Sequence, residues 1–177
     1  DLDNDFLKRF HPDHRDGTYI GLGKLLDSCV RFAYHTSDPA CLERKKYLVE
    51  HALRLQEADG YIGTCKPDNR LWPAWDLHEM SYLIQGLVAD YKHFRADESL
   101  RAARRLADYI LAVWSAQPGR NPAPRLAENL PTCGFPSALL GLYGATGDER
   151  YLDFLLTQRR LAEWDLPIIL GRWGNVA

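Results

Sequence analysis

Residues 142–152 read LYGATGDERYL, and this stretch indicates how the chain folds. An apolar run closes at Tyr143, a short polar break follows, and a new apolar run opens at Leu152. Gly147 can adopt the left-handed conformation that ends a helix. Asp148 can then cap the next helix by accepting a backbone N–H. The stretch therefore predicts two helices joined by a tight turn.

The same pattern occurs twice more, as AYHTSDPACL at residues 33–42 and DYKHFRADESL at residues 90–100. In the first of these copies Asp38 takes the capping position, and Pro39 enters the first helical turn, where its missing N–H costs nothing. The tyrosines that mark the three copies are 57 and 52 residues apart: Tyr34, Tyr91 and Tyr143. A repeat of this length is typical of stacked helical hairpins.

The segments beside the turns have helical periodicity, with apolar residues three and four positions apart. Six helices are predicted, near residues 19–36, 39–58, 76–94, 97–115, 133–146 and 149–163. No long alternating run indicates a strand. The fold class is therefore all-α, with three hairpins at about 19–58, 76–115 and 133–163.

The connections between hairpins, residues 59–75 and 117–131, are long, and loops of this length are usually functional. Long loops on one rim of a hairpin array are typical of a toroid or a solenoid. At about 55 residues per hairpin, a closed ring of six needs roughly 330 residues. Residues 1–177 are thus predicted to form one partial domain, half of an (α/α)6 toroid. An open solenoid that is complete at three repeats is the alternative.

Composition excludes some classes of function. The net charge of −2 argues against a nucleic-acid groove, which needs a basic surplus. No apolar run approaches the roughly 20 residues that cross a bilayer, so no membrane partner is expected. The chain begins with an acidic, polar segment rather than with Met or a secretory signal. We therefore expect a partial product, and its compartment is not predicted.

No metal site is expected within the chain, because its four cysteines lack zinc-ligand spacing. Cys29 lies in an apolar run and is interpreted as a core residue. Cys133 lies at a predicted helix start, where the helix dipole could lower its pKa, but no partner histidine is evident.

The candidate substrate-binding residues lie in DGYIGT, residues 59–64, and LWPAWDLHEMSY, residues 71–82. Aromatic faces stack on sugar rings, while carboxylate, imidazole and phenol groups fix hydroxyls, so this mixture suits a sugar-binding cleft. The predicted set is Tyr61, Trp72, Trp75, Asp76, His78, Glu79 and Tyr82.

Structural interpretations compete with this one. Trp72 and Trp75 could plug the space between hairpins, and Asp76 could be a helix N-cap. Asp76 and Glu79 are three residues apart, and paired carboxylates are the signature of glycoside hydrolysis, but such pairs also occur on many solvated helices.

Several segments, in matching order along nearly the whole chain, resemble the N-terminal half of glycoside hydrolase family 127, the bacterial β-L-arabinofuranosidase-like group. The segments that carry the resemblance are DFL (5–7), GKLL (23–26), DGYIGT (59–64), WD (75–76), LIQGL (83–87) and TGDERYLD (146–153).

The resemblance implies an (α/α)6 catalytic domain and a retaining exo-glycosidase with a cysteine nucleophile, a glutamate acid/base and a zinc ion. Those groups lie in the second half of the family's domain. No residue here matches them, so the catalytic residues are expected outside this chain. Tyr82 falls where members place an inward-facing polar residue, and Thr132–Cys133 where some place a polar pocket residue. Residues 20–22 are apolar or glycine where members have polar or acidic residues, and this departure affects the expected substrate.

Three functions follow as hypotheses. The first is part of a hydrolase of arabinofuranosides or related plant-type glycans, inactive as this chain alone, with zinc expected only in a full-length parent. The second is a non-catalytic module that binds a glycan or a protein. The third is another toroid enzyme, such as a sugar epimerase or a lyase. The expected partners are a carbohydrate and either the remainder of the toroid or a second copy, through the open face.

Overall fold

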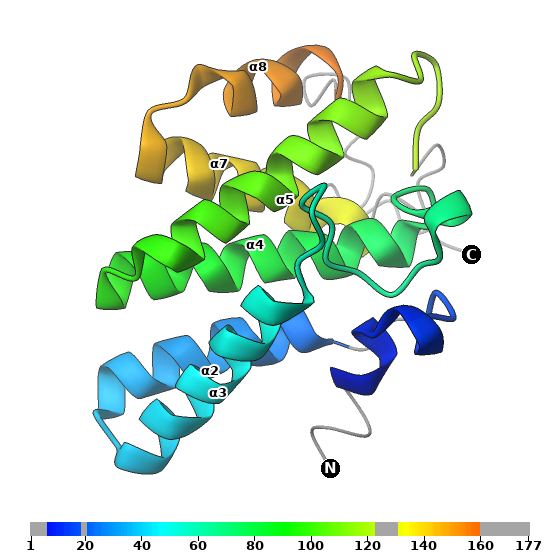
Figure 1. Ribbon diagram of the computed structural model, residues 1–177. Helices are drawn as coiled ribbons and strands as arrows, with labels where there is room; N and C mark the ends of the chain where they lie inside the picture. The colour runs from blue at the N-terminus through cyan, green and yellow to red at the C-terminus, as the bar shows by residue number, and fades with distance from the viewer. Residues whose placement is uncertain (1–6, 19–20, 123–130, 160–177) are drawn as a thin grey trace, which may run out of the picture.

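A computed structural model describes residues 7–18, 21–122 and 131–159, and within them every regular element is helical. The α-helices, shown in Figure 1, are α2 (Leu22–Thr36), α3 (Pro39–Leu55), α4 (Ala74–Phe94), α5 (Asp97–Ser115), α7 (Gly134–Thr146) and α8 (Glu149–Thr157). Short 3-10 helices occupy Leu7–Phe10, Pro12–His14, Pro67–Asn69 and Pro131–Cys133. None of the helices described is long and apolar enough to cross a membrane.

The predicted hairpin turns are confirmed. Each first helix of a pair ends on a residue in the left-handed conformation, namely Ser37, Arg95 or Gly147. Asp38 and Asp148 cap the following helices, because their side chains accept the backbone N–H groups of Cys41 and Arg150 respectively.

Some predicted helix bounds need correction. The helix predicted to reach residue 58 ends at Leu55, where the chain turns extended at Gln56. The helix predicted to start at residue 76 begins at Ala74. The last helix ends at Thr157; residues 160–163 of its predicted range, and residues 19–20 of the first, lie outside the described residues.

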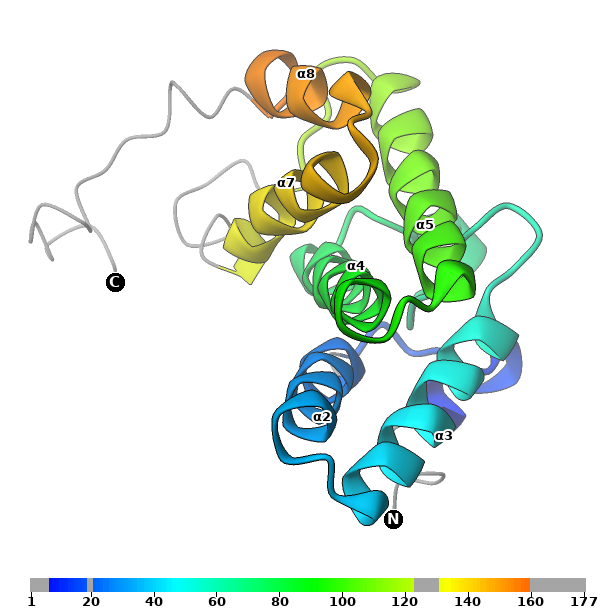
Figure 2. The same ribbon diagram turned by 90° about the vertical axis from the view of Figure 1, so that its left-hand side faces the viewer.

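The helices form two layers (Figure 2). The inner layer consists of α2, α4 and α7, with α4 in the middle, and the outer layer consists of α3, α5 and α8. The inner helices run parallel. Along α2, Gly23 lies against Tyr82 and Asp27 lies against Gly86, one turn further along α4. Along α7, Gly134 lies against Tyr82, and Gly141 lies closest to Val88. The first helix of each hairpin is thus inner and the second outer, which is the arrangement of an α/α toroid.

Close packing brings the inner helices together. A Cβ atom at Gly23 would lie 2.4 Å from the backbone nitrogen of Leu83, a distance that no side-chain adjustment can relieve. Glycine is therefore required at this crossing of α2 and α4. The contact fixes the N-terminal ends of these helices side by side.

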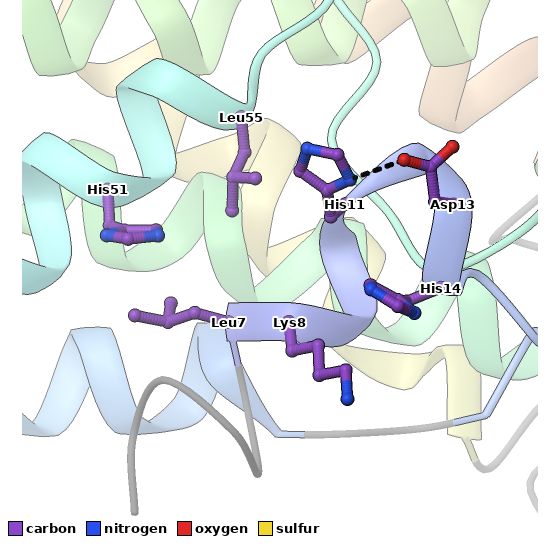
Figure 3. Close-up of a pocket in the computed structure, with 7 residues that line it drawn as sticks. All are labelled: Leu7, Lys8, His11, Asp13, His14, His51 and Leu55. Carbon is purple, nitrogen blue, oxygen red and sulfur yellow. Dashed lines mark ion pairs between the residues drawn. The ribbon is translucent and has the colours of Figure 1, made fainter.

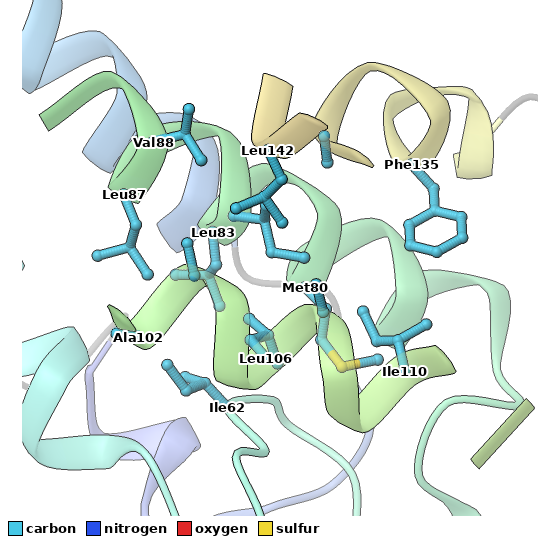
Figure 4. Close-up of a cluster of buried hydrophobic side chains, with 14 of the residues drawn as sticks. Ile62, Met80, Leu83, Leu87, Val88, Ala102, Leu106, Ile110, Phe135 and Leu142 are labelled. Atoms are coloured by element: carbon cyan, nitrogen blue, oxygen red, sulfur yellow. The ribbon is translucent and has the colours of Figure 1, made fainter. Parts of the chain in front are cut away.

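The hydrophobic core lies between the layers, and Figure 4 shows its central part. Trp114 of α5, Phe135 of α7 and Phe154 of α8 form an aromatic cluster with ring centroids 5.4–6.1 Å apart, which joins the third hairpin to the second. The labelled residues of the core are Ile62, Met80, Leu83, Leu87, Val88, Ala102, Leu106, Ile110, Phe135 and Leu142.

The array is an open arc. Among the described inner helices, α4 packs against both α2 and α7. Figure 2 shows α2 and α7 on opposite sides of α4, each with its outer helix beside it. The all-α, partial-toroid fold class predicted from the sequence is confirmed.

Candidate functional site

An aromatic stripe runs along the first two turns of α4. Trp75, His78 and Tyr82 are three and four residues apart, so they share one helical face. The ring centroids of Trp75 and His78 are 5.3 Å apart, and those of His78 and Tyr82 are 4.8 Å apart. Trp75 is 48% exposed, Tyr82 is half-buried and His78 is buried. The stripe thus presents one half-exposed ring and one partly covered ring to solvent.

The stripe lies where the three inner helices begin. From α2, the Nζ atom of Lys24 sits 4.7 Å from the centre of the Tyr82 ring. From α7, a Cβ atom at Gly134 would lie 3.1 Å from the Tyr82 ring, so glycine leaves room for that ring. Gln85, one turn further along α4, donates from Nε2 to the Gly134 carbonyl at 2.8 Å. Lys24 and Gln85 are absent from the predicted site residues, although Gln85 has the helical spacing that places it on the stripe's face.

A groove of mixed polar and apolar lining continues from the stripe towards the C-terminal ends of α2 and α4. Its volume is about 460 Å³, and Gln85, Lys92 and His93 of α4 line it together with Arg31 of α2 and Ser137 of α7. Its walls carry donor and acceptor groups, while Val88 and Ala138 supply apolar surface. This mixture of polar and apolar groups suits a polyhydroxylated ligand.

Glu79 ties α4 to the start of α2. Its Oε1 accepts the backbone N–H of Gly23, and its Oε2 accepts that of Gly21, both at 2.7 Å. The N–H groups of Gly21 and Gly23 lie at the N-terminus of α2, where backbone N–H groups have no intrahelical partner and the helix dipole favours a carboxylate. The buried Glu79 therefore anchors the N-terminal end of α2 to α4.

Asp76 binds the loop that precedes α4. Its oxygens accept the Tyr61 hydroxyl at 2.9 Å and the backbone N–H groups of Leu71 and Thr64 at 2.8 and 3.3 Å. Burial raises the pKa of Asp76 and outweighs these hydrogen bonds, which lower it. The interpretation of Asp76 as a helix N-cap is wrong, since Pro73 occupies that position.

Tyr61 is the centre of the same loop. Its hydroxyl accepts the Cys65 N–H at 2.9 Å, and the guanidinium carbons of Arg15 and Arg70 lie 5.1 and 4.1 Å from the centre of its ring. Burial, with the nearby charge of Asp76, raises the pKa of Tyr61. Tyr61 and Asp76 have no solvent-exposed surface, so in this arrangement they support the loop rather than line the groove.

Ion pairs that were not predicted from the sequence join the loop before α4 to the segment after α3 and to Arg15 near the N-terminus. Arg15 pairs with Glu57, and Arg70 pairs with both Glu57, at 2.8 Å, and Asp59, at 3.2 Å. Arg15 and Arg70 are 55 positions apart in the sequence, so no local pattern could predict that both bind Glu57.

Trp72 lies apart from the stripe. The guanidinium carbon of Arg120 sits 4.0 Å from the centre of the Trp72 ring, so the two long inter-hairpin connections meet here. The connections at residues 59–75 and 117–131 were predicted to lie on one rim of the array, and the contact of Trp72 with Arg120 brings them together.

A second hollow, of about 340 Å³, lies between the N-terminal 3-10 helices and the end of α3 (Figure 3). Three histidines line it: His11, His14 and His51. The His11 and His14 ring centroids are 6.2 Å apart, and His11 pairs with Asp13 at 3.5 Å. Within residues 7–18, 21–122 and 131–159, neither these nor other His, Cys, Asp and Glu side chains form a group of three that could hold a metal ion.

The cysteines occupy different environments. Burial and the charge of Asp76 raise the pKa of Cys65 to about 12, and burial raises that of the half-buried Cys29. Cys133 is exposed just before α7. Next to it, the hydroxyl of the buried Thr132 accepts a hydrogen bond from Arg159 at 2.8 Å.

Comparison with protein families identifies the chain. Residues 10–164 match the family model for the beta-L-arabinofuranosidase GH127 catalytic domain. A comparison with curated proteins gave no match. Among solved structures, the crystal structure of Ara127N-Se, a GH127 beta-L-arabinofuranosidase from Geobacillus stearothermophilus T6, is similar in fold, with a TM-score of 0.63 and 24% identity. The match covers 83% of this chain and 25% of that one. The chain therefore belongs to the GH127 beta-L-arabinofuranosidase catalytic-domain family and spans about a quarter of the length of that relative.

Proposed function

We propose that this chain forms part of a glycoside hydrolase that acts on arabinofuranosides or related plant-type glycans. Family membership over residues 10–164 is the observation that carries the proposal. It favours a hydrolase over an epimerase or a lyase built on the same kind of toroid.

In this proposal the start of α4 contributes one wall of the sugar pocket. Trp75 offers its exposed ring to the C–H face of a sugar, and Tyr82, held by Lys24 and Gly134, supplies a hydroxyl at the mouth of the groove. His78 lies between the two rings and orients them. Of the other predicted residues, Tyr61 and Asp76 position the loop before α4, Glu79 positions α2, and Trp72 joins the long connections.

The bond-breaking groups are proposed to lie outside this chain. Asp76 and Glu79 each accept two or more backbone or hydroxyl hydrogen bonds, which leaves neither placed as the acid or nucleophile of a paired-carboxylate mechanism. The described donor side chains do not fit a zinc ion, so no step is assigned to one here. A retaining mechanism with zinc in a longer parent remains a proposal drawn from the family resemblance.

A binding experiment tests this role. A β-L-arabinofuranoside is titrated into the whole chain and followed by Trp fluorescence and by calorimetry. We expect saturable binding without hydrolysis, and Trp75→Ala should weaken it at least about tenfold, as expected when an aromatic anchor is lost. Phe32→Ala is the control, because Phe32 is an exposed aromatic residue of α2 that does not line the groove.

The two failures of this experiment mean different things. Absence of binding by the unmodified chain would refute the pocket contribution. Hydrolysis by the chain alone would refute the assignment of the catalytic groups to a region outside it.

A further inference from the structure

The groove that continues from the stripe has a cationic far end. Arg31 of α2 and Lys92 of α4 line it there, and no Asp or Glu is among the described residues that line it. The chain as a whole carries a net charge of −2, so this lining does not reflect a generally basic surface. The positive charge is a local feature of the groove.

Another hollow shows how different a charged lining can be. It has a volume of about 500 Å³ and lies between α3 and the start of α5. Both signs of charge line it: Lys45, Lys46 and Arg101 together with Glu50, Asp90, Asp97 and Glu98. The charges of that hollow compensate one another, as in the 2.7 Å pair of Lys45 with Asp90, so they favour no particular ligand charge.

Arg31 keeps most of its hydrogen-bonding capacity for a ligand. Both carboxylate oxygens of Asp27 accept from its Nε atom, at 3.0 and 2.9 Å. Among the described residues no partner engages its Nη1 and Nη2 atoms, which carry four of the five N–H donors of a guanidinium. The planar fork of such donors matches the two oxygens of a carboxylate.

Lys92 supplies a second cation from the neighbouring helix. Its side chain is exposed, and it forms no ion pair with any residue that the structure describes. Asp27 offsets one of the two positive charges, so one remains uncompensated at this end of the groove while His93 is neutral.

His93, which lines the same end, experiences this positive potential. Burial lowers the pKa of His93, and the nearby charge of Arg31 lowers it further. His35 and Lys92 act in the same direction, and Asp27 opposes them. A potential that disfavours a further proton on an imidazole favours an anion at the same place.

A single sugar is too short to touch both the stripe and the cationic end. Tyr82 and Lys92 are ten positions apart on α4. At a rise of about 1.5 Å per residue this separation is about 15 Å, more than one sugar ring spans. Between them, Gln85 and Ser137 bring hydrogen-bonding groups and Val88 brings apolar surface. A ligand that fills the groove is therefore an oligosaccharide.

We propose that the groove takes an acidic glycan, with an arabinofuranosyl end at the stripe and a uronic acid whose carboxylate is held by Arg31 and Lys92. This inference rests on the proposed sugar pocket and adds a charge to its class of substrate. The carboxylate accepts from the Nη groups of Arg31 and from the ammonium group of Lys92, and both contacts are charge-assisted hydrogen bonds.

Calorimetric titration of the whole chain with three ligands tests the proposal. The first is a neutral β-L-arabinofuranosyl oligosaccharide, the second carries a galacturonate residue at its other end, and the third is the methyl ester of the second. We expect the acid to bind at least about fivefold more tightly than its ester at low salt. The ratio should approach one in about 500 mM NaCl, because salt screens exposed charges.

Substitutions locate the carboxylate. Arg31→Gln and Lys92→Gln should each reduce the preference for the acid over its ester, and the double variant should abolish it, while the affinity for the ester stays unchanged. Lys46→Gln removes the same charge as Lys92→Gln at an exposed position of α3 outside the groove, and this control should keep the full preference. Circular dichroism checks that each variant is folded.

The outcomes separate this inference from the proposed sugar pocket. Equal affinities for the acid and the ester, or a preference that survives the double substitution, would overturn the inference and leave the pocket standing. Binding of the acid through Arg31 and Lys92 without any affinity for the neutral oligosaccharide would refute the pocket and keep the anionic site. Absence of binding by all three ligands would refute both.

Discussion

Two carboxylates that look catalytic in the sequence hold backbone together in the structure. Asp76 and Glu79 have the spacing of a paired acid and base, yet each is buried and accepts N–H groups from the chain around it. The sequence could not reveal this, because α4 is buried on nearly all sides and periodicity does not indicate which polar residue faces which neighbour.

Glu79→Gln tests the anchoring of α2. The amide keeps one acceptor but turns its NH₂ group towards the other backbone N–H, so we expect a loss of about 1–3 kcal/mol of unfolding free energy. Urea denaturation measures the change. Glu43→Gln, at an exposed position of α3, is the control, and an equal effect of both substitutions would contradict the anchoring role.

Tyr61→Phe tests the loop before α4. It removes the donor to Asp76 and the acceptor of the Cys65 N–H, both buried, and we expect a loss of about 1–3 kcal/mol. Tyr34→Phe, at a half-exposed ring, should change stability by less than about 0.5 kcal/mol. Comparable losses in the two variants would show that the hydroxyl of Tyr61 is not needed.

The network around Glu57 predicts a pH dependence. Burial raises the pKa of Glu57, but hydrogen bonds from Arg15 and Arg70 outweigh it and hold the pKa below its usual value. A carboxyl with a lowered folded-state pKa contributes stability above its unfolded-state pKa, and this contribution disappears as pH falls through the folded-state value. The contribution of Glu57 is therefore expected to fade below about pH 4.

Urea midpoints of the unmodified chain and of Glu57→Gln, measured from pH 2.5 to 6, check this dependence. The difference between the two proteins should be largest near pH 6 and should narrow as the pH falls below about 4. A difference that is constant over the range would show that the Glu57 charge contributes nothing.

At the scale of elements, the turn of the third hairpin depends on backbone conformation. Gly147 has a φ of 70°, and open space surrounds the position of a Cβ atom there. Gly144 lies within α7 and has equally open space. We expect Gly147→Ala to destabilise the fold by about 1 kcal/mol and Gly144→Ala to stabilise it by up to about 1 kcal/mol. Thermal unfolding distinguishes them, and equal shifts would contradict the left-handed turn.

The difference between local and long-range interactions explains how much of the fold the sequence predicts. Turns such as 146–148 and the six helices are local, so periodicity and capping residues predict them. The predicted start of α4, residue 76, is two residues late. One interpretation made Asp76 the N-cap, whereas Pro73 occupies that position. The Arg15–Glu57–Arg70 network and the Gly23 crossing are long-range contacts, and no local pattern encodes them. Of the candidate site, Trp75, His78 and Tyr82 are among the residues proposed from the sequence, whereas their neighbours Lys24 and Gln85 are not.

At the scale of the whole molecule, the arc places the starts of the three inner helices at one rim. The rim gathers Trp75, Tyr82, Lys24 and Gly134 from all three inner helices. The proposed sugar binding depends on this arrangement, because no single hairpin carries all of these groups.

The most direct test of the account is to map where a sugar binds. Heteronuclear NMR of the isotopically labelled chain, titrated with a β-L-arabinofuranoside, reports on every backbone amide and Trp indole. The account predicts saturating shifts at the Trp75 indole and at the amides of Tyr82, Gln85 and Gly134, with Phe32 and Leu156 unchanged. Shifts confined to other regions, or none at saturating sugar, would contradict the claim that this chain forms a wall of the sugar pocket.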